Sequence, residues 1–267
     1  RRSSDLRTNR LAPGEITGMF DEDTTLTAVW GTTDPYMSVD VVTEVEKTNL
    51  IAENPSGANG GQHIFDFTQV MIGGATVGDK VVSISFQDQA LQGTLNADGT
   101  DPRKATITDA PQGVDLSKIL YARYVGPIHE DGSISDTSVY AYLVESQTNA
   151  GKYDMIVAGD GGVTAPESAV KLFSNFKADG WQKSIERIAF NDCLDTSQVI
   201  DASRWFSYCS ALKEISGIDT LFANAAPTTF YAMFYKCGAL TSLNLSQWNV
   251  SQVTNIAYMF EGCSALK

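Results

Sequence analysis

The side chains that could carry out chemistry are few and scattered along the chain. There are two histidines, His63 and His129, and neither stands beside a cysteine or serine in a recognisable nucleophile setting. The four cysteines show no Cys-x-x-Cys spacing of the kind that binds zinc. Gly159-Asp-Gly-Gly162 is not followed by the Lys-Ser/Thr pair of a phosphate-binding loop, which favours a simple turn. We therefore expect no cofactor and no resident metal.

Carboxylates are the remaining candidates for chemistry. The chain has 32 Asp and Glu residues, and a glycoside hydrolase needs only two that face each other across a cleft. No motif singles out such a pair, so a surface glycoside hydrolase is the least favoured function and we expect no enzyme. The acidic turns Asn96–Asp101 and Glu130–Asp136 offer oxygen ligands for calcium, but neither has the spacing of an EF-hand. Calcium binding stays open, because Asp-Gly turns are also common without a metal.

Three of the cysteines belong to an internal repeat. Each lies three residues after a phenylalanine and three before a leucine, and the phenylalanines are Phe206, Phe234 and Phe260. The columns step by 28 and then 26 residues. A period in this range is typical of a solenoid, whose units must stack to bury their apolar faces. The cysteine column therefore predicts buried thiols that behave as small apolar residues, with Cys193 outside the column and all four cysteines free.

Each repeat unit has two predicted parts joined by a polar turn. The first is a short helix that ends in Phe-x-x-Cys, and the second is a strand such as Leu240–Leu245. Leu194–Val199 and Trp248–Val253 place Asp, Asn, Ser and Thr between strand and helix, where they can accept N–H groups at a helix start. A weaker fourth copy precedes these units, with Leu172–Phe176 as its helix and Ile185, Ile188 and Phe190 as its strand.

The repeat pattern resembles the BspA-like leucine-rich repeats of bacterial surface proteins. The closest copy runs Leu243-Asn-Leu-Ser-Gln-Trp-Asn-Val-Ser-Gln-Val-Thr and continues to Met259-Phe-Glu-Gly-Cys-Ser-Ala-Leu266. The resemblance covers about 165–267, with Trp205 and Ile256 at positions where the family usually has methionine. It implies an α/β solenoid, display at the cell surface, and interaction with host or neighbouring-cell proteins or glycans.

We expect three regions along the chain. Residues 1–30 form a leader and the tail of a β-grasp-like repeat, because 18–30 ends in Thr-Leu-Thr-Ala-Val-Trp and resembles the closing strand of the Listeria–Bacteroides repeat. Residues 31–137 form a β-rich, sandwich-like spacer domain. Residues 138–267 form a hairpin cap and the truncated repeats, so the chain as a whole is mainly β with a C-terminal α/β solenoid. The predicted strands are 37–43, 63–72, 80–86, 119–125, 139–144 and 153–157, with one helical turn at 114–118.

Charge and hydropathy exclude two classes of partner. The formal net charge of −13 argues against nucleic acid, because phosphates require Lys and Arg patches. The chain has no run of about 18 apolar residues, so we expect no membrane contact by this part of the protein. The pattern begins and stops abruptly, which is the expectation for a piece of a longer, exported polypeptide.

The expected function is that of an extracellular adhesion module, at the cell surface or in the cell wall, which binds a protein or a glycan through the repeats. Polar side chains that flank the apolar columns at the strand edge would make the contact; they are Lys213, Glu214, Thr241, Ser242 and Asn244. The alternative is a structural stalk or spacer that presents another domain.

Overall fold

A computed structural model describes residues 49–54, 63–99, 101–129, 134, 139–174 and 180–267. These residues belong to one compact unit, Thr48–Lys267. The expected leader and β-grasp-like tail at 1–30, the strand expected at 37–43 and most of the acidic turn Glu130–Asp136 lie outside the described residues.

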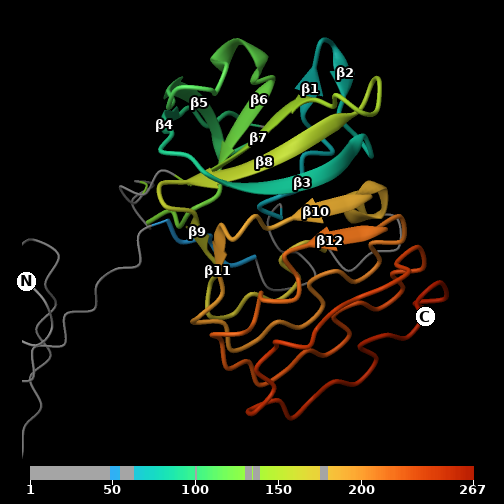
Figure 1. The fold of residues 1–267 in the computed structure, drawn as a ribbon. Coiled ribbons are helices and arrows are strands. Elements are labelled where there is room, and N and C mark those ends of the chain that lie inside the picture. Colours follow the sequence, from blue (N-terminus) through green and yellow to red (C-terminus); the bar gives the residue numbers. More distant parts are fainter. Residues whose placement is uncertain (1–48, 55–62, 100, 130–133, 135–138, 175–179) are drawn as a thin grey trace, which may run out of the picture. The chain divides into compact units, whose positions relative to one another are not determined.

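Within the described residues the main element is a mixed sheet (Figure 1). Its strand order is β12 (Glu214–Ser216), β10 (Arg187–Ala189), β3 (Val81–Asp88), β8 (Tyr153–Gly159), β7 (Tyr140–Glu145), β6 (Tyr121–Tyr124), β5 (Lys104–Asp109) and β4 (Gln92–Leu95). The strands from β12 to β8 pair in parallel, and those from β8 to β4 pair in antiparallel fashion. The prediction of a mainly β protein is confirmed.

The alternation of side chains in β3 shows why the sheet has two different faces. Ile84 and Phe86 are buried in the main core, where Phe86 contacts Phe173 and Phe190. The residues that precede each of them, Ser83 and Ser85, are half-buried on the opposite face. Because side chains alternate along a strand, one face of the sheet joins the main core, whereas the other carries polar groups together with a second, smaller apolar cluster that includes Tyr142 and Ala158.

Two smaller strand pairs accompany the sheet. β1 (Met71–Ile72) and β2 (Ala75–Thr76) form a short antiparallel hairpin. β9 (Val163–Thr164) pairs in parallel with β11 (Leu194–Asp195), which leads from the sheet into the repeats.

Several strand predictions are confirmed, and two are wrong, namely 63–72 and Leu240–Leu245, of which the latter contains no strand. β3, β6 and the β7–β8 hairpin form where expected, and the helical turn is η2 (Leu116–Lys118), capped by Asp115. The strand predicted at 63–72 is wrong, because only its last two residues are extended and paired. Asp66 closes a turn there by accepting hydrogen bonds from the Thr68 N–H and hydroxyl groups, at 2.9 and 2.7 Å.

A buried arginine holds that turn against the sheet. Arg123, on β6, is 1% exposed, pairs with Asp101 at 2.7 Å and lies 4.5 Å from the Phe67 ring centre. Its Nη1 donates to the carbonyls of Ile64 and Asp66, at 3.1 and 2.7 Å. A buried charge is costly unless it is paired and hydrogen-bonded. The arginine on the sheet therefore needs the carbonyls of the turn, and these contacts hold the turn in one position against the sheet.

The repeats stack through backbone hydrogen bonds between four segments, 169–173, 201–208, 229–236 and 255–261, here called the turn ladder. Within it, Phe173 N–H donates to Trp205 O at 3.1 Å, and Phe206 N–H donates to Met233 O at 2.9 Å. Neighbouring bonds recur at every second residue, and the isolated bridges between the segments are all parallel.

The short helices predicted for the repeats are absent from the described residues, which have turns in these places. Positive φ values recur two residues before and two residues after the phenylalanines: Arg204 and Tyr208 (60° and 63°), Ala232 and Lys236 (52° and 60°), and Tyr258 and Gly262 (60° and 79°). Left-handed residues interrupt a right-handed helix. Backbone N–H groups that a helix would use internally bond instead to the next segment of the ladder.

The repeated phenylalanines form a stacked column inside the ladder. Phe173, Phe206, Phe234 and Phe260 have successive ring centres 5.4, 5.2 and 5.6 Å apart, with interplanar angles of 8°, 13° and 4°. The first three are buried, whereas Phe260 is 41% exposed. The fourth, weaker repeat predicted from Leu172–Phe176 therefore contributes Phe173 to the same column.

An unexpected segment covers the first phenylalanine of the column. Phe65 stacks on Phe173 with ring centres 6.0 Å apart at 6°. His63 Nε2–H donates to Lys171 O at 2.9 Å, and Asn54 Nδ2 donates to the same carbonyl at 3.1 Å. The hairpin expected as a cap lies within the sheet, and β3 is the strand that pairs with β10 of the first repeat. Strands from both sides of residue 137 thus share one sheet.

Removing a ring from the middle of the column should destabilise the protein more than removing one at its exposed end. We expect Phe234→Ala to lower the free energy of unfolding by about 3–5 kcal/mol, because it leaves a cavity between two stacked rings. Phe260→Ala, in the same column but 41% exposed, is the matched control and should cost clearly less. Denaturant unfolding of both variants checks this, and equal losses would contradict the stacked column.

Acid should loosen the segment that covers the column. Burial lowers the pKa of His63 to about 4, and Nδ1 accepts the Phe65 N–H at 3.1 Å, so the native imidazole is neutral. Between pH 6.5 and pH 4 the unfolded chain binds a proton that the native chain does not, so stability falls as the pH falls through this window. The expected loss is about 3 kcal/mol. His63→Gln should flatten this pH dependence, which denaturant unfolding of both proteins between pH 7 and pH 4 checks.

Candidate functional site

The carboxylates of the acidic turn Asn96–Asp101 accept hydrogen bonds from nearby backbone N–H groups and form ion pairs. Asp98 accepts the Asp101 N–H at 2.9 Å and pairs with Lys104 at 2.9 Å. Asp101 accepts the Arg103 N–H at 2.9 Å and holds the buried Arg123. These two carboxylates therefore have structural partners, and the described residues contain no cluster of three or more His, Cys, Asp or Glu side chains placed to hold a metal.

The cysteine column connects each repeat to the preceding one. The thiols of Cys237 and Cys263 donate to the carbonyls of Phe206 and Phe234, both at 3.0 Å, and Cys209 lies 3.9 Å from Phe173 O. Burial raises the pKa of the Cys209 and Cys237 thiols, so both stay protonated and unreactive at neutral pH. Cys193 lies outside this column and is half-buried, and all four cysteines are free.

The side chains predicted for the strand edge are all exposed, and most of them come together. Lys213 and Glu214 from one repeat, with Ser242 and Asn244 from the next, line a hollow of about 270 Å³ that we call the edge hollow. Its remaining lining residues are Ile215, Ile218, Asp219 and Leu243. Thr241 is exposed but is not one of the lining residues, and its carbonyl accepts the Lys267 N–H at 3.2 Å.

Charges in the edge hollow are partly engaged within the protein. Lys213 Nζ lies 2.8 Å from Glu186, whose pKa is lowered mainly by this hydrogen bond. Asn244 Oδ1 accepts the Ser246 N–H at 3.1 Å, which fixes the side chain at the start of a turn. Carboxylate, ammonium, hydroxyl and amide groups therefore lie within one hollow.

A second exposed surface was not predicted from the sequence. It follows the turn ladder and consists of tyrosines and cations, here called the tyrosine strip: Arg204, Tyr208, Tyr231, Tyr235, Lys236 and Tyr258. Tyr208 and Tyr235 meet edge to face at 5.3 Å, and Lys236 lies 5.4 and 5.2 Å from the centres of their rings.

The strip continues to the repeat of Phe260, and a cation adds a second contact between the repeats of Phe206 and Phe234. Tyr231 contacts Tyr258 edge to face at 5.7 Å, and the Arg204 guanidinium lies 4.8 Å over the Tyr231 ring. These residues are close to the phenylalanines in sequence but lie outside the core, half-buried or exposed. The sequence signal for this surface is the tyrosines that lie close to each repeated phenylalanine. The predicted helices did not bring these tyrosines together, because a helix places different residues on one face than the turns of the ladder do.

Thiol counting tests the free cysteines. The unfolded, unreduced chain should react with a thiol reagent at four sites, because no disulfide joins the cysteines. In the native chain Cys209 and Cys237 should be protected by burial, and Cys193→Ser should remove one reactive site. Two or fewer reactive thiols in the unfolded chain would mean that a disulfide is present.

Comparison with known proteins finds a family for the repeats. Residues 170–267 match the family described as Mycoplasma protein of unknown function, DUF285, which is the domain of BspA-like surface proteins. Searches of curated proteins and of solved structures found no match. Among the described residues no helix is long and apolar enough to cross a membrane. The repeat region is thus similar to DUF285.

Proposed function

We propose that this chain is a binding module of a bacterial surface protein, with residues of about 165–267 forming a BspA-like leucine-rich repeat solenoid. Its partner would be a protein or glycan on a host or neighbouring cell, and its place would be extracellular. The similarity to DUF285 supports the surface assignment. The parallel bonds of the turn ladder support a solenoid, because each repeat joins the next in the same register.

The observation that carries this proposal is the convergence of exposed side chains from successive repeats. The edge hollow takes its polar groups from two repeats, and the tyrosine strip runs over three. Tyrosine and arginine are enriched in protein interfaces, because they provide large contact areas with polar ends. A repeating surface of this kind suits a macromolecule better than a small substrate, so the proposal includes no enzymatic activity.

The test uses the full chain and two cluster variants. One variant is Lys213→Ala/Glu214→Ala/Ser242→Ala/Asn244→Ala in the edge hollow. The other is Tyr231→Ser/Tyr235→Ser/Tyr258→Ser in the tyrosine strip. Gln252→Ala, an exposed substitution outside both surfaces, is the control. Binding to matrix proteins, mucins and cell-surface glycans is measured together with thermal unfolding.

We expect the wild-type chain to bind at least one component, and one cluster variant to lose at least about tenfold in affinity while it stays folded. The variant that loses affinity identifies the contact surface. Binding that survives in both variants would contradict the proposal. A chain that binds nothing while its parent protein binds cells would instead support the stalk or spacer function.

A further inference from the structure

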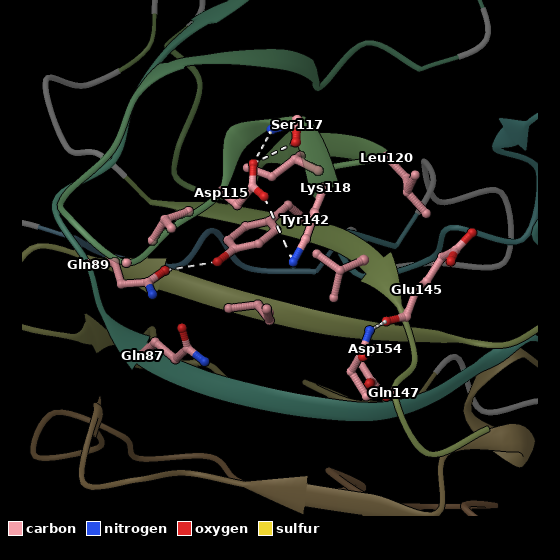
Figure 2. A pocket seen from close by; sticks show the side chains of 15 residues that line it. Gln87, Gln89, Asp115, Ser117, Lys118, Leu120, Tyr142, Glu145, Gln147 and Asp154 are labelled. Atoms are coloured by element: carbon pink, nitrogen blue, oxygen red, sulfur yellow. Dashed lines mark hydrogen bonds and ion pairs between the residues drawn. The ribbon is translucent and has the colours of Figure 1, made fainter. Parts of the chain in front are cut away.

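A cleft on the face of the large sheet that points away from the main core is separate from the repeats (Figure 2). It measures about 760 Å³, and its lining comes from β3, β7 and β8, from Gln89 and Gln147 just beyond the ends of β3 and β7, and from the segment 113–120 that contains η2. Pockets of this size are typical of small-molecule sites. The opposite face of the same strands belongs to the main core, so the floor of the cleft is rigidly supported.

Side-chain amides line both ends of the cleft. Figure 2 shows Gln87 and Gln89 at one end and Gln147 at the other, with Tyr142 between them. Burial raises the pKa of Tyr142 to about 12, so its hydroxyl stays protonated and donates to Gln89 Oε1 at 2.9 Å. This bond orients the Gln89 amide with its nitrogen as a donor.

The charges of the lining disfavour an anionic ligand. Asp115, Glu145 and Asp154 face a single cation, Lys118, which already lies 3.8 Å from Asp115. The pKa of Asp115 is lowered, chiefly by the hydroxyl and N–H of Ser117, so this carboxylate is ionised at neutral pH. Phosphates, sulfated sugars and sialylated sugars would therefore meet net negative charge.

The position of the cleft also disfavours an extended peptide. Peptides commonly add a strand to an exposed sheet edge, where backbone groups are unpaired. β3, β8 and β7 are internal strands with partners on both sides, so the cleft offers side-chain groups in place of backbone groups.

From this combination we infer that the cleft binds a short, neutral oligosaccharide. Amide and carboxylate groups match the hydroxyl groups of sugars, since each hydroxyl both donates and accepts hydrogen bonds. Apolar side chains in the lining, such as Val144 and Ile156, match the C–H faces of sugar rings. This inference rests on the proposed binding function and assigns it a ligand class and a second site.

The test is calorimetric titration of the full chain with neutral oligosaccharides, namely lactose and the tetraoses of cellulose, starch, laminarin and chitin. Sialyllactose is the anionic counterpart of lactose. Gln87→Ala/Gln89→Ala removes amides from one end of the cleft, and Val144→Trp fills it without removing a polar group. Gln252→Ala is the control, and thermal unfolding shows that each variant is folded.

We expect at least one neutral oligosaccharide to bind with a Kd of about 1 mM or lower, and lactose to bind better than sialyllactose if lactose binds at all. Both cleft variants should lose about tenfold or more in affinity. The edge-hollow and tyrosine-strip variants should keep wild-type affinity for this ligand.

The experiments distinguish a wrong ligand assignment for the cleft from a wrong proposal for the function of the repeats. If no neutral oligosaccharide binds, or if charged ligands are preferred, the cleft assignment is overturned, whereas binding of cell-surface components through the repeats is unaffected. Saccharide binding that is lost in an edge-hollow or tyrosine-strip variant but retained in both cleft variants would also overturn it. Val144→Trp is disregarded only if it unfolds, and the double amide variant then decides.

Discussion

The structure depends on backbone hydrogen bonds that run from one repeat to the next. In the turn ladder, alternate N–H groups donate to the following repeat, so no repeat can satisfy its backbone alone. The phenylalanine column and the thiols of the cysteine column fix the same register from inside. Stacking is therefore required for both the polar and the apolar groups of each unit, as expected when repeats contact only their neighbours.

This constraint also determines what the surface displays. Residues beside the phenylalanines point outward at the same height in each repeat, which produces the tyrosine strip. Polar residues of adjacent repeats meet in the edge hollow for the same reason. At the other end, Phe65 continues the column into the sheet region, so the large sheet and the repeats share one apolar core. The proposed binding surfaces are thus held in place by the same register that stabilises the core.

The sequence was informative where a pattern repeated and uninformative where contacts were distant. The step of the Phe, Cys and Leu columns predicted which side chains stack, and alternation predicted β3, β6 and the β7–β8 hairpin. The prediction of short helices is wrong because the three-residue spacing from Phe to Cys also fits turns that contain left-handed residues. Lys and Tyr, which occupy several of these left-handed positions, give no indication of a positive φ in the sequence. The strand prediction for 63–67 is wrong because the side chain that binds the carbonyls of this segment, Arg123, is distant in sequence. No local pattern indicates that these carbonyls accept from an arginine and do not pair with a strand.

The candidate surfaces could likewise be predicted only in part. Four of the five predicted edge residues line one hollow, because the step of the repeat places equivalent positions of successive units next to each other; among the four, only Glu214 lies in a strand. The sheet-face cleft could not be predicted, since its lining comes from strands whose order in the sheet differs from their order in the sequence. Residue-resolved amide hydrogen exchange tests the turn ladder most directly. The ladder predicts slow exchange at alternate positions, Ala202, Arg204, Phe206 and Tyr208, and again at Phe230, Ala232, Phe234 and Lys236. Exchange at these positions as fast as in an unfolded chain would contradict it.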